Sequence, residues 1–254
     1  MKLVVLGSGT SVPHPQRTSA AFWLETEAAR LLLDAGADAV HRMAEERLDW
    51  PHLDAIWVSH FHLDHAAGVA PFLFATKWAP QTSSRREPLH IYGGVGLEKL
   101  IEAWDESNHY NLLKQNFPIQ IHEIEPGAVF QIATGLTAKT FSTPHTPESL
   151  AIRLTNSHGS SLVYSSDTGC SDELIEFARA ADLLVLECSF RTNKPVQTHL
   201  ELTEAIAIAN QCRPRRLMLA HFYPEWDGHD VAKEAKELWS GETIEAVDGL
   251  RLEF

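Results

Sequence analysis

The residues best suited to chemistry occupy positions 60–65, His-Phe-His-Leu-Asp-His, where three imidazoles and one carboxylate fall within six positions. Neutral imidazole and carboxylate are ligand types that zinc, manganese and iron accept. The preceding apolar run predicts a strand, and alternate residues of an extended chain face one side, so His60 and His62 can share one ion. Asp64 and His65 are displaced along the chain and suit a neighbouring ion. A histidine-rich surface loop is the alternative interpretation, but the ligand types and their spacing favour a metal site.

Three further candidate ligands each lie at the end of a strand-like run, where they could complete a binuclear site. His145 stands in a proline-flanked loop, Asp167 follows Leu-Val-Tyr-Ser-Ser, and His221 closes Leu-Met-Leu-Ala-His. Polar side chains at the ends of buried strands are costly to hold there unless their hydrogen bonds are satisfied. The alternative is that these residues are a turn-capping aspartate and two structural histidines. Considered together with the segment 60–65, however, the three residues favour metal binding.

The elements that must position these residues are short strands and amphipathic helices, which alternate without a linker or an internal repeat and predict a single domain over residues 1–254. Strands are expected at 2–6, 21–25, 30–34, 55–59, 119–124, 128–131, 136–142, 151–154, 161–165, 183–187 and 216–220. Helices are expected at 39–47, 65–77, 96–106, 172–179, 202–211 and 230–238, before a terminal hairpin ending at Phe254. This pattern predicts an α/β sandwich of two sheets packed face to face and covered outside by helices.

The composition is that of an ordinary globular protein, with 44% apolar and 22% charged residues among 254. No apolar run is long enough to cross a bilayer, and the N-terminus reaches glycine too soon for a signal peptide. The three cysteines, an odd number without a Cys-x-x-Cys pair, predict reduced, buried thiols and a cytoplasmic location. The net charge of −13 disfavours long nucleic acid as a partner, although bound divalent ions would leave room for a small phosphate ester.

The pattern His-x-His-x-Asp-His, followed by a distant His, then Asp, then His, resembles the metallo-β-lactamase superfamily over nearly the whole chain. Within it, the chain looks most like the ribonuclease Z and cyclic-phosphodiesterase branch. The segments that match this branch are Gly7-Ser8-Gly9-Thr10, Leu33-Asp34-Ala35-Gly36, Ser166-Asp167-Thr168, Leu186-Glu187-Cys188-Ser189-Phe190 and Thr198-His199-Leu200. The resemblance implies the four-layer αββα sandwich with two mixed sheets.

The resemblance also implies how two divalent ions would be held. One ion would be bound by His60, His62 and His145, the other by Asp64, His65 and His221, with Asp167 bridging both. Zinc is the expected metal, while manganese and iron suit the same ligands. A pair of such ions can hold a shared hydroxide as the nucleophile and polarise a phosphoryl oxygen, and Asp64 could also orient the attacking water.

Glu187 and His199 match the pair that this branch uses as a proton relay toward the leaving group. A carboxylate bound to an imidazole fixes its tautomer and raises its basicity. The alternatives are a salt-bridged strand end for Glu187 and a helix-start residue for His199. Three further residues give weaker predictions. Asp34 is expected to support the metal loop through a hydrogen bond to a ligand, and His14 either lines the cleft or is an exposed loop residue. Tyr223 replaces the small hydroxyl residue that often touches phosphate in proteins of the family that this chain resembles.

The interval between His145 and Asp167 leaves no room for the long arm with which tRNA-processing relatives grip tRNA. The expected activity is therefore that of a phosphodiesterase acting on a small or cyclic nucleotide or a related phosphodiester. One alternative is a lactone or thioester hydrolase, although those branches generally lack the Glu187 and His199 equivalents. Two others are a tRNA 3′-processing endonuclease helped by a partner and a non-catalytic metal-binding protein. Exposed Trp78 or Phe74 could serve a homodimer interface.

Overall fold

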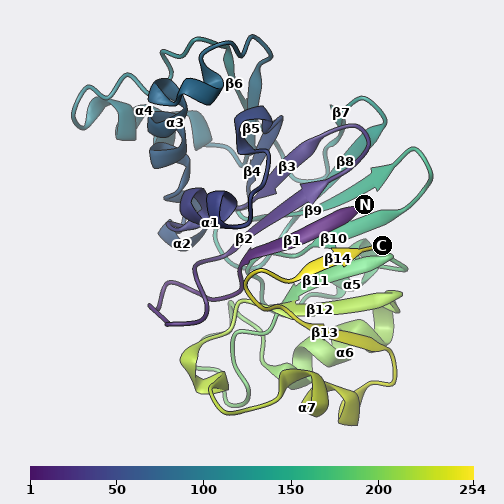
Figure 1. The fold of residues 1–254 in the computed structure, drawn as a ribbon. Coiled ribbons are helices and arrows are strands. Elements are labelled where there is room, and N and C mark those ends of the chain that lie inside the picture. The colour runs from purple at the N-terminus through teal and green to yellow at the C-terminus, as the bar shows by residue number, and fades with distance from the viewer.

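Strand-forming segments throughout the chain build two sheets of seven strands each, and a computed structural model describes all residues 1–254 (Figure 1). The first sheet has the order β14-β1-β2-β3-β4-β5-β6, formed by β14 (Arg251–Glu253), β1 (Lys2–Gly7), β2 (Ala21–Glu25), β3 (Arg30–Leu33), β4 (Ala55–Val58), β5 (Leu89–Gly93) and β6 (Ile119–Glu123). The second has the order β13-β12-β11-β10-β9-β8-β7, formed by β13 (Glu242–Glu245), β12 (Arg216–Ala220), β11 (Leu183–Glu187), β10 (Ser161–Tyr164), β9 (Leu150–Asn156), β8 (Leu136–Ser142) and β7 (Val129–Ala133).

Both sheets are mixed. In the first sheet the pairs from β14 to β3 are antiparallel and those from β3 to β6 are parallel. In the second sheet the pairs from β7 to β10 are antiparallel and those from β10 to β13 are parallel. Each sheet therefore has a parallel half in which neighbouring strands end at the same edge.

The residues of β1 show why the sheets form a layered structure. Leu3 and Val5 belong to the core between the sheets, whereas Val4 and Leu6 belong to the core under the outer helices. This alternation is the period of two that a strand buried on both faces requires.

The first sheet is covered by α1 (Ala39–Glu45), α2 (Leu63–Ala66), α3 (Val69–Trp78) and α4 (Leu97–Glu106), and the second by α5 (Asp172–Phe177), α6 (Leu202–Cys212) and α7 (Val231–Leu238). The predicted αββα sandwich is confirmed.

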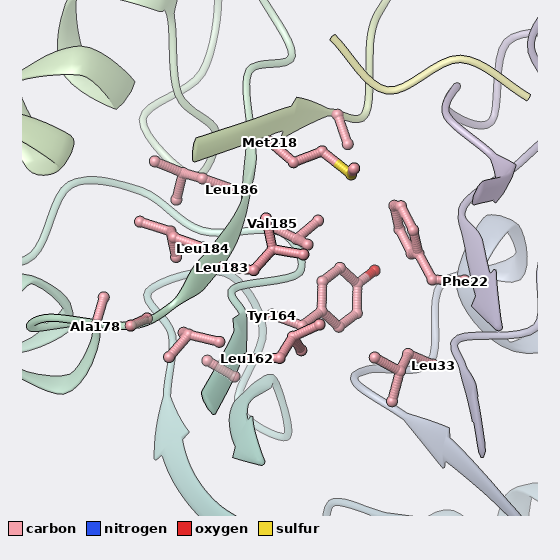
Figure 2. Packing of buried hydrophobic residues seen from close by; sticks show 14 of the residues in the cluster. Phe22, Leu33, Leu162, Tyr164, Ala178, Leu183, Leu184, Val185, Leu186 and Met218 are labelled. Atoms are coloured by element: carbon pink, nitrogen blue, oxygen red, sulfur yellow. The ribbon is translucent and has the colours of Figure 1, made fainter. Parts of the chain in front are cut away.

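Large side chains from both sheets fill the space between them (Figure 2). Phe22 of β2 packs against Tyr164 of β10, with ring centroids 5.3 Å apart and a tilt of 59°. Leu162 of β10 is fully buried in the same cluster. Tyr164 carries a polar group into this core, and its hydroxyl donates to the Asp34 carboxylate at 2.6 Å. The packing between the sheets therefore connects directly to the polar residues at their edge.

The parallel halves of both sheets bring their carboxyl ends to one region. Asp34 follows β3 and His60 follows β4 in the first sheet, while Asp167 and His221 follow β10 and β12 in the second. The amide of Leu150 donates to the carbonyl of Ser59 at 2.9 Å, so the backbones of the two sheets are also joined there. Candidate ligands that are far apart in the sequence can meet at this edge.

Several sequence expectations differ from the structure. The predicted helix 65–77 is two helices, because the amide of Gly68 donates to the carbonyl of Ala35 at 2.7 Å instead of continuing the helical hydrogen bonds. Strand β5 lies outside the predicted set. The predicted terminal hairpin is wrong, because β13 pairs with β12 while β14 pairs with β1 in the other sheet.

The surface expectations have mixed outcomes. Cys188 and Cys212 are buried as predicted, but Cys170 is exposed because it lies in the loop before α5. Phe74 and Trp78 are exposed, as the homodimer hypothesis requires, and that hypothesis remains a prediction. None of the helices combines the length and apolar character needed to span a bilayer.

Replacing Leu162 by alanine should lower the free energy of unfolding by about 2–5 kcal/mol, because the substitution leaves a cavity in the core between the sheets. Urea unfolding followed by circular dichroism measures the change. Val129→Ala is the matched control, since Val129 is 65% exposed and its loss should change stability by less than about 0.5 kcal/mol. Equal losses in the two variants would contradict the assigned core.

Candidate metal centre

The seven predicted ligands converge at the edge where the two sheets end. One group consists of His60, His62, His145 and Asp167, whose candidate ligand atoms all lie within 4.8 Å of one another. A second group with the same spacing consists of Asp64, His65 and His221. These are the two sets that the resemblance implies for two ions, and the structure therefore brings together every side chain named for that purpose.

Asp167 lies between the two groups. Its Oδ2 is 3.7 Å from Nε2 of His60 and 3.6 Å from Nε2 of His145. Its Oδ1 is 3.3 Å from Nε2 of both His65 and His221. One carboxylate oxygen thus faces each group, which is the placement that a bridging ligand needs.

The hydrogen bonds made by His65 and His221 determine which ring nitrogens are free. Nδ1 of His65 is 2.7 Å from the Asp34 carboxylate, which can only accept, so this nitrogen carries a proton. Nδ1 of His221 lies 2.9 Å from the Ser189 hydroxyl. In the neutral ring of His65, Nε2 then presents a lone pair, and this atom is 3.2 Å from Nε2 of His221. Where the Ser189 oxygen accepts from Nδ1 of His221, Nε2 of that ring is a lone pair as well. Two lone pairs face one another favourably only when a cation or a proton lies between them.

The first group shows the same arrangement. Nδ1 of His145 is 3.0 Å from the carbonyl oxygen of Thr198, which leaves Nε2 as a lone pair 3.1 Å from Nδ1 of His62. Nε2 of His60 and Oδ1 of Asp167 are buried without any hydrogen-bond partner. Burial, together with the nearby His65, lowers the pKa of His60 to about 2, so this imidazole is neutral.

These observations fit divalent metal ions. Ligand nitrogens on a single tetrahedral zinc ion are separated by about 3.3 Å, given zinc–nitrogen distances of 2.0–2.1 Å. The observed separations of 3.1 and 3.2 Å within the two groups are close to this value. Seven buried side-chain atoms of the chain lack a hydrogen-bond partner, and two of them, Nε2 of His60 and Oδ1 of Asp167, lie among the ligands, where a bound ion would be their partner.

Asp34 supports the centre from behind, as predicted. Its carboxylate is fully buried and accepts from the Ser59 amide at 2.7 Å, from the Ser59 hydroxyl at 2.8 Å and from His65. Because the Ser59 hydroxyl donates to Asp34, it can accept from Nδ1 of His60 at 3.1 Å. Asp34 therefore orients one histidine directly and a second through Ser59.

Sharp turns place the ligands at the strand ends. Asp34, Ser166 and His221 have φ values of 56°, 51° and 61°, in the left-handed region that residues other than glycine rarely adopt. Asp34 and His221 directly follow β3 and β12, and Ser166 lies two residues after β10, so the backbone leaves its extended conformation at the point where the site begins. Backbone strain of this kind persists only where the surrounding structure fixes it.

Glu187 and His199 form the predicted contact beside the centre. Nδ1 of His199 is 3.0 Å from Oε1 of Glu187, and the carboxylate also accepts from the amides of Thr168 at 2.6 Å and Leu200 at 3.1 Å. Burial would lower the pKa of His199, but the hydrogen bond and charge of Glu187 raise it above its usual value. His199 also lies near Asp167 and His221, with which it forms a third group of candidate ligand atoms.

The predictions for His14 and Tyr223 have different outcomes. His14 belongs to none of the ligand groups, and its Nε2 binds Asp227 at 3.2 Å, beside Arg17, which binds the same carboxylate. Tyr223 lies at the centre, with its ring centroid 6.2 Å from that of His221. Its ring stacks on Phe190 at 4.8 Å and 15°, so a bulky aromatic pair occupies this side of the site.

Two supporting residues lie outside the predicted set. Ser189 belongs to a segment that the resemblance singles out, but its contact with His221 spans 32 positions and has no local signal. Asp248 accepts from the amides of Ser8 and Thr18, both at 2.8 Å, and so anchors the loop between β1 and β2. Only the folded chain shows these partners.

Known proteins share this architecture. A family model described as beta-lactamase superfamily domain matches residues 29–222. Ribonuclease Z of Methanosarcina acetivorans is 25% identical over 308 residues, covering 100% of this chain and 98% of the relative, and the probable metallo-hydrolase YhfI of Bacillus subtilis is 28% identical, covering 98% of each. The crystal structure of YhfI matches with a TM-score of 0.85 at 25% identity, covering 99% of each chain. This chain therefore belongs to the beta-lactamase superfamily and is a hydrolase with the metallo-β-lactamase fold.

Proposed function

We propose that the two groups of ligands hold two divalent metal ions, of which zinc is the expected one and manganese or iron the alternatives. His60, His62 and His145 would hold one ion, Asp64, His65 and His221 the other, and Asp167 would contact both. When bound, such ions lower the pKa of a water molecule to about 7 and polarise a phosphoryl oxygen. The unpaired buried atoms of His60 and Asp167 support this assignment.

The reaction we propose is hydrolysis of a small or cyclic nucleotide-type phosphodiester. The observation that carries it is the buried Glu187–His199 pair, which lies beside the ligands without completing either of the two groups that the ions would occupy. Because Glu187 accepts from Nδ1 of His199, Nε2 remains available to hold a proton for a leaving alkoxide. Hydrolysis of a phosphodiester with a poor leaving group requires such an acid, and Asp64 could in addition orient the attacking water.

The absence of a long insertion favours a small substrate. Between His145 and Asp167 the chain forms only β9 and β10, joined by a turn at 157–160. The alignment with the Methanosarcina ribonuclease Z spans 308 residues against the 254 of this chain, so the relative contains segments that this chain lacks. The net charge of −13 also disfavours a long nucleic acid.

Cleavage of precursor tRNA at the 3′ end is the second candidate. It is favoured by the curated relatives named ribonuclease Z, which align along almost the whole chain at 25–28% identity. A partner that supplies the missing grip on tRNA would reconcile this activity with the short β9–β10 connection. Hydrolysis of a lactone or thioester at the same site is a further alternative, which would not require an acid at His199.

An activity screen separates these reactions. Zinc- or manganese-loaded protein should hydrolyse bis(p-nitrophenyl) phosphate and cyclic nucleotides, and it should act weakly or not at all on precursor tRNA, lactones and thioesters. Release of p-nitrophenolate and chromatography of the products measure these activities. Metal-loaded protein that is inert on every phosphodiester would contradict the proposal.

His199→Ala should affect substrates according to their leaving groups. With a cyclic nucleotide, whose leaving group is a poor alkoxide, kcat should fall by about 10²–10⁴-fold, the usual contribution of a general acid. With bis(p-nitrophenyl) phosphate the fall should be much smaller, because p-nitrophenolate needs no proton to depart. His158→Ala, which removes an exposed histidine bound to Glu27, is the control and should leave both rates unchanged. Full activity of His199→Ala on cyclic nucleotides would favour an ester-type reaction instead.

Metal removal should lower stability and rebinding should restore it. Elemental analysis of the saturated protein should find two ions per chain. At a free zinc concentration 100 times Kd, each ion should add about 2.7 kcal/mol to the free energy of unfolding, because the unfolded chain lacks the site. His41→Ala, which removes an exposed histidine on α1, should still bind two ions. Fewer than two ions at saturation would contradict the assignment and favour a non-catalytic protein.

A further inference from the structure

The hydroxyl of Ser189 connects the two parts of the site that the proposed function treats separately. Ser189 is fully buried and follows β11 by two residues. Its Oγ is 2.5 Å from Oε2 of Glu187 and 2.9 Å from Nδ1 of His221. A third contact, at 3.3 Å, joins the same oxygen to Nδ1 of His199. One side chain therefore touches a proposed metal ligand and both residues of the proposed proton relay.

The donors and acceptors around Ser189 allow only one arrangement of protons. Glu187 receives backbone amides on both of its oxygens, from Thr168 and Leu200, so it acts as an acceptor toward all of its neighbours. The single proton of the Ser189 hydroxyl must then point to Glu187. Its oxygen is left as an acceptor, which obliges His221 to carry its proton on Nδ1 and to present the Nε2 lone pair toward Asp167 and His65.

The backbone holds this hydroxyl in place. The amide of Tyr223 donates to the carbonyl of Ser189 at 3.2 Å, and the amide of Cys188 donates to the carbonyl of Ala220 at 2.8 Å. The segments that follow β11 and β12 are thus joined on both sides of the contact between Ser189 and His221. The hydroxyl does not need to be ordered when an ion binds.

We propose that Ser189 is a positioning residue that fixes the tautomer of His221 and makes Glu187 support metal binding as well as proton transfer. Its role toward His221 corresponds to the role of Asp34 toward His65, except that a hydroxyl transmits the effect of the carboxylate. The inference rests on the proposed metal centre but not on the identity of the substrate. Partners of this kind typically change metal affinity by about 10–100-fold.

The first test is nitrogen NMR of the metal-free wild-type protein at a pH where imidazoles are neutral. The nitrogen signals of His221 should show that Nδ1 carries the proton and that this proton is in a hydrogen bond. A proton on Nε2 would overturn the proposal, and this measurement does not depend on whether any variant folds.

The second test is zinc titration of metal-free variants against a chromophoric chelator. Ser189→Ala should weaken one of the two ions by about 10–100-fold and leave the other within about threefold, while Ser189→Thr, which keeps the hydroxyl, should restore most of the affinity. Ser161→Ala is the control. It removes another buried serine hydroxyl, at the start of β10, which contacts Asp182 and none of the ligands, and it should leave both affinities unchanged. Unchanged affinities in Ser189→Ala, or an equal loss in Ser161→Ala, would overturn the proposal.

A double-mutant cycle tests the path through Glu187. If Ser189 acts by transmitting the effect of the carboxylate, the losses of zinc affinity in Ser189→Ala and Glu187→Gln should not add. Additive losses would show that Ser189 acts alone. Because these readouts need no substrate, a protein inert on phosphodiesters would refute the proposed reaction while leaving this inference standing.

Discussion

The site depends on imidazole lone pairs that face one another at the edge between the sheets. Nε2 of His65 and Nε2 of His221 are 3.2 Å apart, and each ring has its Nδ1 committed to a hydrogen-bond partner. Such a pair is repulsive unless a cation or a proton lies between the two nitrogens, so the partners of Nδ1 hold the rings in a geometry that a metal ion can complete. The strands of both sheets end here, which is why ligands far apart in the sequence can take part.

The supporting polar groups are expensive to bury and are correspondingly well paired. Asp34 is fully buried, yet it accepts from Ser59, His65 and Tyr164, so its desolvation is offset by charge-assisted hydrogen bonds. Tyr164 belongs to the core between the sheets, where it packs on Phe22 (Figure 2). The apolar packing of the two sheets and the orientation of the ligands are therefore coupled, and loosening the first should disturb the second.

Much of the site could be predicted from the sequence because ligand type, spacing and strand ends are local features. His60, His62 and their neighbours form one short segment, and His145 and His221 each follow a recognisable strand. The supporting partners could not be predicted, because a contact such as that of Ser8 with Asp248 spans 240 positions and either residue alone is unremarkable in type.

The differences in the fold have the same origin. The first short helix ends before Gly68 because the amide of Gly68 donates to the carbonyl of Ala35, and no periodicity in the segment reveals that contact. The last strand pairs with β1 although β13 also has a free edge, and no local pattern shows which of the two pairings forms. Local patterns therefore predict the elements, while tertiary contacts decide their boundaries and partners.

Anomalous X-ray diffraction from zinc-loaded crystals, recorded on both sides of the zinc absorption edge, tests the central claim most directly. Two peaks are predicted, one in contact with His60, His62 and His145 and the other in contact with His65 and His221, with Asp167 between them. Occupied zinc positions elsewhere on the surface, with no peak among these residues, would contradict the account.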